Sequence, residues 1–394
     1  MLWLASENQN TKFRYTKQKE KQMAKDWMKL LQKHEGAVVE DYDPFSHTIR
    51  TPSPSVNFCF GNTHGLPQGF TLVLYGPPKG GKSVICNSMI GQLHKDDPNA
   101  IAIKFNTEMR EMGQLTAEQA KVWGIDRNRY IAYDVNQPEL IFDFIEKEVN
   151  AYCQDGMPLK LIVIDSATAI QGRRAQNADS ILTQQIGDHA LTIQDGLKRI
   201  LAIQRRHKLA VVITTHVRAE MDQLEKMRGN NTKMAASYGL KHHAEYFMMV
   251  EPWNSKEGKT DLLGNKLENE NLSDAMENAE RTGHKIRVAM KDSSMGPKGR
   301  VGVFTLDYHR GIINVHEEVF LLGVNRGVIQ RPNNMTYMFG EKKWNGKQAM
   351  LDALKDDGSL REAVLKQVRM QDVEMPLAQH SGVVGVVGAV EEVD

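Results

Sequence analysis

The sequence is poor in cysteine, has no excess of charge of either sign and contains no long apolar run. Its three cysteines, Cys59, Cys86 and Cys153, are too few and too scattered for a disulfide framework or a zinc knuckle. The formal net charge of +1 gives no bulk attraction for polyanions, so any surface for nucleic acid must be local. Neither a signal peptide nor a span of about 20 apolar residues is evident. We therefore expect a cytoplasmic protein with no membrane partner.

What the sequence does contain is a regular alternation of short β-branched runs and helical stretches between about residues 56 and 315. The segments between the earlier runs are long enough for crossover helices. This pattern predicts an α/β fold with a mostly parallel central sheet flanked by helices. The predicted strands are Thr71–Tyr75, Ile101–Phe105, Leu161–Ile164, Val211–Thr215 and Ile286–Met290.

Changes in composition divide the chain into four predicted parts. Lysines alternate with apolar residues at 12–34, which is typical of an amphipathic basic helix, so we expect an N-terminal helical arm and linker over 1–50. The core is expected over 51–315. Helical patterning then returns, which predicts a small C-terminal domain over 316–372. The remaining residues, 373–394, repeat glycine and valine before turning acidic, and we expect a flexible tail.

A complete phosphate-binding motif lies between an apolar run and a helical stretch. The segment 76–83 reads Gly-Pro-Pro-Lys-Gly-Gly-Lys-Ser and fits G-x-x-x-x-G-K-[ST], although a chance glycine-rich turn is the alternative. Its glycines allow a tight turn whose N–H groups face a phosphate at the positive end of the next helix. Lys82 would reach the outer phosphates and the Ser83 hydroxyl would hold Mg²⁺, so we expect ATP and Mg²⁺ as cofactors. The predicted nucleotide-binding residues are Gly76, Pro77, Pro78, Lys79, Gly80, Gly81, Lys82, Ser83 and Val84.

Two carboxylates follow predicted strands. Asp165 ends the run Leu161–Ile164, which is the Walker B position for a carboxylate that holds magnesium directly or through water. Glu108 lies just beyond Ile101–Phe105, and catalytic groups gather past the carboxyl ends of parallel strands. A carboxylate at this position can polarise the water that attacks the γ-phosphate. On these residues alone, a solvated loop glutamate is an equally good interpretation of Glu108.

In this order, the motifs resemble those of the RecA recombinase family, with UvsX-like phage proteins as near relatives. The segment Phe105-Asn106-Thr107-Glu108 resembles the one that bears the catalytic glutamate, and Ile164-Asp165-Ser166 resembles the Walker B segment Val-Asp-Ser. Leu322-Gly323-Val324 resembles the start of the C-terminal domain. The resemblance covers roughly residues 50–370. It implies a RecA-like P-loop NTPase core with an N-terminal helical arm and a small C-terminal domain, acting as a DNA-dependent ATPase.

The resemblance also implies catalytic roles for individual residues. Lys82 and Glu108 match the phosphate-binding lysine and the water-activating glutamate. His216 follows the strand Val211–Thr215, where RecA has a sensing glutamine and UvsX-like proteins have histidine. It would contact the γ-phosphate and pass that information to the next loop, although a strand-end histidine is more often structural.

One family feature is incomplete. The family's Lys-x-Lys reaches across a subunit boundary to the neighbour's phosphates, and here it reads Lys291-Asp292-Ser293. Lys291 matches and is the predicted contact in trans, whereas Ser293 departs from the pattern. Lys298 and Arg300 are the candidates to replace the missing lysine.

The resemblance implies two DNA-binding loops. The second follows His216, and basic groups there can neutralise phosphates while apolar groups wedge between bases. The first falls by spacing near 176–187. For the second loop, a mobile polar surface loop is the alternative, and the first loop departs from the family's Gly-Asp-Ser-His-Met. The predicted DNA-binding residues are Ile181 and Leu182 in the first loop, and Arg218, Lys226, Met227, Arg228, Gly229, Asn230 and Lys233 in the second.

The sequence is therefore interpreted as an ATP-dependent DNA recombinase that forms filaments on single-stranded DNA and catalyses homologous pairing and strand exchange in recombination and repair. The expected partners are single-stranded DNA, homologous duplex DNA, further copies of the chain, and single-strand-binding and mediator proteins. If the chain is phage-encoded, the cytoplasm is that of a bacterial host. Two alternatives stay open, a RecA-fold hexameric replicative helicase motor and a weakly hydrolysing RecA-like mediator or paralogue.

Overall fold

A computed structural model of the chain describes residues 46–109, 115–171, 188–219, 232–235, 240–253, 283–294 and 296–374, together with Lys29 and Asp43. The chain divides into two compact units, Met1–Asp43 and Pro44–Asp394, and every helix and strand with assigned bounds lies in the second. The predicted basic helix lies outside the described residues apart from Lys29, as does the predicted tail beyond Glu374.

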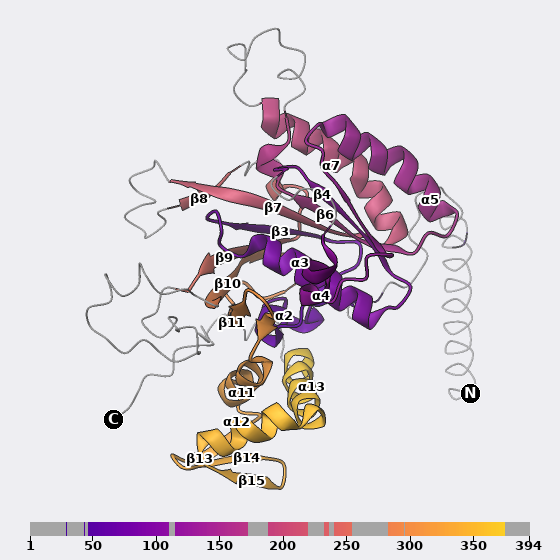
Figure 1. The fold of residues 1–394 in the computed structure, drawn as a ribbon. Coiled ribbons are helices and arrows are strands. Elements are labelled where there is room, and N and C mark those ends of the chain that lie inside the picture. The colour runs from indigo at the N-terminus through magenta and orange to yellow at the C-terminus, as the bar shows by residue number, and fades with distance from the viewer. Residues whose placement is uncertain are drawn as a thin grey trace, which may run out of the picture. The chain divides into compact units, whose positions relative to one another are not determined.

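A mixed sheet forms the centre of the second unit, and its ten described strands follow the order β12-β11-β10-β9-β3-β7-β6-β4-β5, with β8 paired to β7 (Figure 1). The neighbouring pairs from β9 to β5 are all parallel. These strands consist mostly of buried apolar residues, because a parallel sheet is covered on both faces. The prediction of an α/β fold with a mostly parallel core is confirmed. The parallel strands are β3 Thr71–Gly76, β4 Ile101–Asn106, β5 Tyr130–Tyr133, β6 Leu159–Asp165, β7 Ala210–Ala219 and β9 Tyr246–Pro252.

Antiparallel strands extend the sheet beyond β9. The predicted run Ile286–Met290 lies inside β10 Gly283–Ser293, which pairs antiparallel with both β9 and β11. β11 Val301–Asp307 pairs in turn with β12 Gly311–Ile313. The short β8 Thr232–Met234 runs antiparallel to the end of β7.

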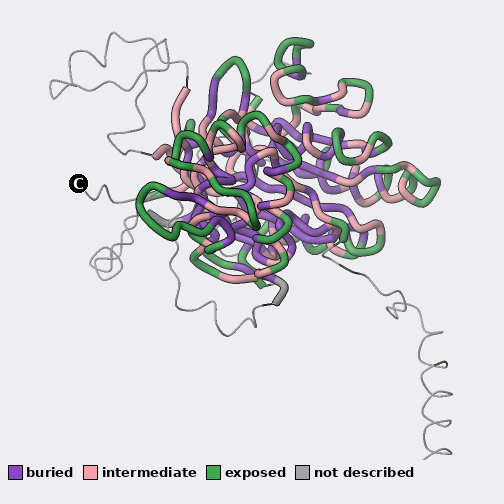
Figure 2. Tube along the Cα trace, turned by 90° about the horizontal axis from the view of Figure 1, so that it is seen from below, coloured by how far each residue is buried: buried purple, intermediate pink, exposed green. Residues whose placement is uncertain are grey.

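Helices cover both faces of the sheet. Figure 1 shows α7 Asp188–His207 and α5 Asn150–Gln154 over one face, and α3 Lys82–Asp96 and α4 Ala117–Trp123 over the other. The π-helical segments η2 Glu139–Asp143 and η3 Ile145–Val149 precede α5. Apolar residues of η2, η3 and α7 pack on the strands in one buried cluster, which includes Phe105, Ile141, Phe142, Ile145, Ile162, Ile193, Leu197, Ile200 and Ile213. Figure 2 shows buried residues along the strands and exposed residues at the turns.

Short elements precede the core. They are β1 Thr48–Ile49, α2 Pro54–Phe58, η1 Gly61–Thr63 and β2 Leu66–Pro67, and the further 3-10 turn η4 Ala167–Ala169 follows β6. α2 has Pro54 in its first turn and Ser53 as its N-cap, whose hydroxyl accepts from the N–H of Val56. A proline and a serine at these positions stabilise a helix N-terminus.

The chain after β12 forms helices around a three-stranded antiparallel sheet. Val319, Leu322, Met350, Leu354 and Val364 belong to its buried apolar cluster. The boundaries expected at residues 50, 315 and 372 stay predictions. The elements are α11 Val315–Asn325, β13 Gln330–Asn333, β14 Thr336–Phe339, β15 Lys342–Asn345, α12 Lys347–Asp356 and α13 Gly358–Glu374.

A buried carboxylate, Asp372, joins α13 to the core. Arg300 donates to both of its oxygens at 2.8 Å, Arg326 donates at 2.6 Å, and His64 Nε2 lies 2.9 Å from Oδ2. Burial raises the pKa of Asp372, but the hydrogen bonds from His64 and Arg300 outweigh it and hold that pKa below its ordinary value. The guanidinium of Arg300 also stacks over Phe58, with 4.2 Å from Cζ to the ring centroid.

Two further features bear on the expectations from composition. Cys59, Cys86 and Cys153 are all free thiols. Within the part of the chain that the structure describes, no helix has the length and apolar character needed to cross a membrane.

Candidate active site

The phosphate-binding motif forms a tight loop between β3 and α3, and its glycines are required by packing. A Cβ on Gly76 would lie 1.9 Å from the carbonyl oxygen of Val250 in β9. Gly81 has a φ of 100°, and a Cβ there would lie 2.6 Å from Ile286 Cδ1 in β10. Only glycine suits such positions. The neighbouring strands thus shape a loop that ends at the N-terminus of a 15-residue helix, where backbone N–H groups have no helical acceptors.

Lys82 is the first residue of α3 and is buried. Its ammonium donates to the carbonyl oxygens of Gly76 at 3.1 Å and Pro77 at 2.8 Å, and lies 3.4 Å from Nδ1 of His216. The cation is therefore held inside the loop, where it faces the end of β7. Pro78 and Lys79 at the tip of the loop are exposed.

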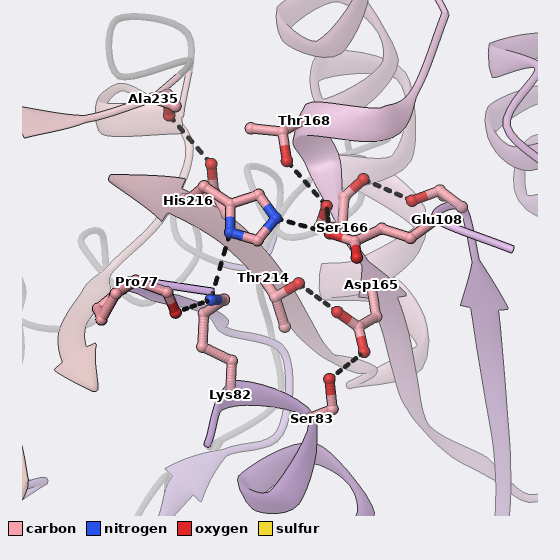
Figure 3. Close-up of polar contacts among 12 residues, drawn as sticks. Pro77, Lys82, Ser83, Glu108, Asp165, Ser166, Thr168, Thr214, His216 and Ala235 are labelled. Atoms are coloured by element: carbon pink, nitrogen blue, oxygen red, sulfur yellow. Dashed lines mark hydrogen bonds and ion pairs between the residues drawn. The ribbon is translucent and has the colours of Figure 1, made fainter. Parts of the chain in front are cut away.

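Asp165 ends β6 and accepts hydrogen bonds from two neighbouring elements. Ser83 Oγ donates to its Oδ2 at 2.8 Å, and Thr214 Oγ1 of β7 donates to its Oδ1 at 2.5 Å. The ammonium of Lys104, from β4, lies 3.6 Å from the same Oδ2. The hydroxyl and the carboxylate predicted to hold magnesium thus lie side by side (Figure 3).

Glu108 and His216 meet at the far side of this cluster. His216 Nε2 lies 2.7 Å from Glu108 Oε1, and Ser166 Oγ donates to the same oxygen at 2.7 Å. The Ser166 hydroxyl lies 2.8 Å from that of Thr168 (Figure 3). Both side chains of the ion pair are about one-fifth exposed, so a small molecule can reach them. Glu108 is therefore not a solvated loop residue but part of an oriented group.

His216 also lies at the base of a β-ribbon. Its carbonyl oxygen accepts from the N–H of Ala235 at 2.8 Å, just where β8 pairs with β7. In that pairing Arg218 lies opposite Lys233, and Arg218 is exposed. The same short segment of β7 thus contacts Lys82, Glu108 and β8.

Four side chains of the cluster are not among the residues predicted from the sequence. They are Lys104, Ser166, Thr168 and Thr214. Thr214 lies inside a predicted strand, and only the pairing of β7 beside β6 identifies it. Lys104 could have been found, because a lysine within the apolar run Ile101–Phe105 is out of place unless a carboxylate lies nearby.

Lys291 and its proposed substitutes lie apart from this cluster. Lys291 is exposed near the end of β10. The strand register through β9 aligns it with the middle of β3, and the phosphate loop follows the end of β3. Lys298 pairs with Asp292 at 2.6 Å and is 63% exposed. Arg300 is bound to Asp372 inside the chain, so it is a poor substitute for the missing lysine.

Most of the predicted DNA-binding residues lie outside the described part of the chain. Of the nine, the structure describes Arg218 and the backbone of Lys233. The others are Ile181, Leu182, Lys226, Met227, Arg228, Gly229 and Asn230.

Comparison with known proteins assigns the family. The chain matches the RecA N-terminal domain over residues 15–312. It belongs to the RecA family. Membership confirms the interpretation as an ATP-dependent DNA recombinase, whereas the phage branch stays a prediction.

Curated RecA proteins resemble the chain along most of its length. Protein RecA of Mycoplasma genitalium is 26% identical over 326 residues, which is 83% of this chain and 85% of the relative. Protein RecA of Aquifex pyrophilus is 21% identical over 323 residues, 82% of each chain. Protein RecA of Oleidesulfovibrio alaskensis is 20% identical over 354 residues, 89% of this chain and 88% of the relative.

Proposed function

We propose that this RecA-family chain binds ATP with Mg²⁺ at the cluster described above and couples its hydrolysis to the pairing of DNA strands. The observation that carries the proposal is the convergence of Lys82, Asp165 and Glu108 from three separate elements. A phosphate-binding cation, a carboxylate beside a helix-start hydroxyl and a carboxylate open to solvent are the groups that phosphoryl transfer requires.

The residues fit the two cofactors. The glycine loop leaves the backbone free to approach a phosphate closely, and Lys82 can exchange its two carbonyl acceptors for phosphate oxygens. Ser83 and Asp165 are oxygen ligands, which Mg²⁺ prefers, and Mg²⁺ usually combines one or two such protein groups with substrate phosphates. When bound, the ion would neutralise charge that develops on the phosphates.

Glu108 is the group proposed to activate water. The hydrogen bonds from Ser166 and His216 hold Oε1 and thereby orient the carboxylate, which is proposed to position a water molecule. His216 then links this carboxylate to Lys82, because its two ring nitrogens face the two residues. A change at the phosphates can therefore move His216 and the end of β8 together.

We propose single-stranded DNA and homologous duplex DNA as the partners, with further copies of the chain forming a helical filament and with single-strand-binding and mediator proteins assisting. Arg218 on β7 is the register partner of Lys233 on β8, so one basic residue lies on each of the two strands beside the central residues of the proposed second DNA loop. Lys291, exposed on β10, is the proposed contact to the neighbouring subunit's phosphates. A phage origin is part of the same proposal.

The test combines hydrolysis and imaging. Phosphate release by the full chain should rise when single-stranded DNA is added, and Lys82→Ala should abolish it while the protein stays folded. Lys95→Ala, at the far end of α3, is the matched control and should hydrolyse normally.

Electron microscopy of the protein on single-stranded DNA separates the alternatives. We expect long helical filaments with ATP. Closed rings would instead indicate a helicase motor, and neither assembly together with negligible hydrolysis would indicate a mediator. Normal turnover by Lys82→Ala would overturn the assignment of the site.

A further inference from the structure

Lys104 places a full positive charge in the interior of the ATPase core. Its side chain has no exposed surface. It belongs to β4, the strand that lies between β5 and β6. A charge in the protein interior is costly unless an opposite charge and hydrogen bonds compensate it. Asp165 Oδ2 lies 3.6 Å from the ammonium, and Asn87 Oδ1 of α3 lies 3.4 Å from it.

Lys104 and Ser83, the second proposed magnesium ligand, contact the same oxygen of Asp165. Asp165 Oδ2 accepts the hydrogen bond from Ser83 at 2.8 Å, while Thr214 binds the other oxygen, Oδ1. A magnesium ion held by Ser83 and Asp165 would therefore share this carboxylate with the Lys104 ammonium. Two cations near one carboxylate repel each other, and the repulsion is strong where water is excluded.

We propose that Lys104 is a positioning residue that satisfies Asp165 in the absence of metal and thereby makes metal binding depend on the nucleotide. The inference rests on the proposed function of the site. Lys104 lies beside Asp165, and Lys82 adds a second positive charge to the same site, where it lies 3.4 Å from His216. Only the phosphates of ATP add enough negative charge to hold a divalent cation as well, so the ion enters with the nucleotide.

The test is the affinity of the nucleotide-free protein for Mn²⁺, a Mg²⁺ substitute whose free form is measured by electron paramagnetic resonance. Lys104→Met should lower the Kd for Mn²⁺ by about tenfold or more, because it removes the competing charge. Lys104→Gln removes the charge but keeps a hydrogen-bond donor, so it should act in the same direction if the methionine variant folds poorly. Lys366→Met removes an exposed lysine of α13 and should leave the Kd unchanged.

A double-mutant cycle decides whether the effect passes through Asp165. In an Asp165→Asn background, the change of Lys104 to Met should no longer alter the affinity for Mn²⁺. An unchanged Kd in both Lys104 variants would overturn the proposal, and so would a gain that persists without the Asp165 carboxylate. Failure of the proposed function itself would look different, because the wild-type protein would then not bind ATP and Mn²⁺ together.

Discussion

Asp165 and Glu108 lie at the ends of the neighbouring strands β6 and β4 but receive different hydrogen bonds. Asp165 accepts from Ser83 and Thr214 and faces Lys104, so its charge is compensated within the protein. Glu108 accepts from Ser166 and His216 on Oε1. Two carboxylates a short distance apart can thus serve two purposes, one toward a cation and the other toward water.

Replacement of Glu108 tests that distinction. Glu108→Gln keeps an oxygen for Ser166 and His216 but loses the base, so we expect ATP and DNA to bind while DNA-stimulated hydrolysis falls by about a hundredfold or more. Phosphate release and DNA affinity, measured on one preparation, check this. Glu118→Gln, in the exposed first turn of α4, is the control. If Glu108→Gln turns over like the wild type, the water must be activated elsewhere.

The predicted site residues that the sequence groups together are those whose proposed role follows from local spacing. Lys82 and Ser83 belong to one short motif, and Asp165 is recognised because it ends an apolar run. Lys104 and Thr214 carry no such motif, and they reach Asp165 only because β4 and β7 flank β6. Register between strands distant in sequence is set by packing, which the order of residues along one strand does not encode.

At the scale of elements, β7 joins the proposed nucleotide site to the proposed second DNA loop. Thr214 and His216 contact the site, and from residue 217 β7 pairs with β8, where the proposed second DNA loop begins. A strand that contacts both sites can couple them only if its contacts differ between the two nucleotide states.

His216→Ala tests this coupling. The variant should bind ATP yet lose much of the gain in single-stranded DNA affinity that ATP produces, because the link from Lys82 to β8 is broken. DNA should lose its effect on ATP affinity by the same factor. The measurement is the ratio of DNA affinities with a non-hydrolysable ATP analogue and with ADP. His207→Ala, at the end of α7, should keep the wild-type ratio; a wild-type ratio in His216→Ala would make this histidine structural.

The sequence predicts most of the parallel strands but misses two of them, β5 and β9. The predicted strands β3, β4, β6 and β7 are continuous apolar runs separated by helical segments, which is typical of parallel strands. β9 was not predicted, although Tyr246–Val250 is largely buried beside β3. Its two methionines and tyrosine lack the β-branched pattern, and its burial comes from packing between β3 and β10.

At the scale of the whole second unit, Glu318 links the region after β12 to the start of the core. It projects from α11, accepts from Ser53 Oγ at 2.5 Å and from the N–H of Ser55 at 3.0 Å, and is fully buried. Burial raises the pKa of Glu318 to about 7, although the hydrogen bonds from Ser53 and Ser55 oppose the rise. The carboxyl at this junction therefore changes charge close to neutral pH.

The raised pKa predicts a pH-dependent stability. In the unfolded chain the group has its ordinary pKa of 4.5, so between pH 4.5 and about 7 the folded state alone holds the proton. The stabilisation is fully present below this window and is lost as the pH rises through it, amounting to about 3 kcal/mol in the free energy of unfolding. The free energy of unfolding measured with urea should therefore fall as the pH rises from 4.5 to about 7.

Glu318→Gln should remove this pH dependence of stability, because an amide does not ionise. The difference in unfolding free energy between wild type and variant should therefore shrink or reverse as the pH rises. Glu341→Gln, which removes an exposed carboxylate of the same region, is the matched control and should follow the wild type. Parallel curves for wild type and Glu318→Gln would contradict an ionisable role for this junction.

The Asp372 cluster determines where the chain can be shortened. Asp372 lies two residues before the end of α13, and Arg300, Arg326 and His64 all depend on its carboxylate. A chain cut after residue 371 would keep almost all of the helix but leave two arginines without their acceptor, a loss of about 3–5 kcal/mol for a broken buried pair. A chain cut after residue 374 would keep the cluster whole. Expression of a trimmed protein, or fusion of a label to its end, should therefore start from residue 374 and not from an earlier position in α13.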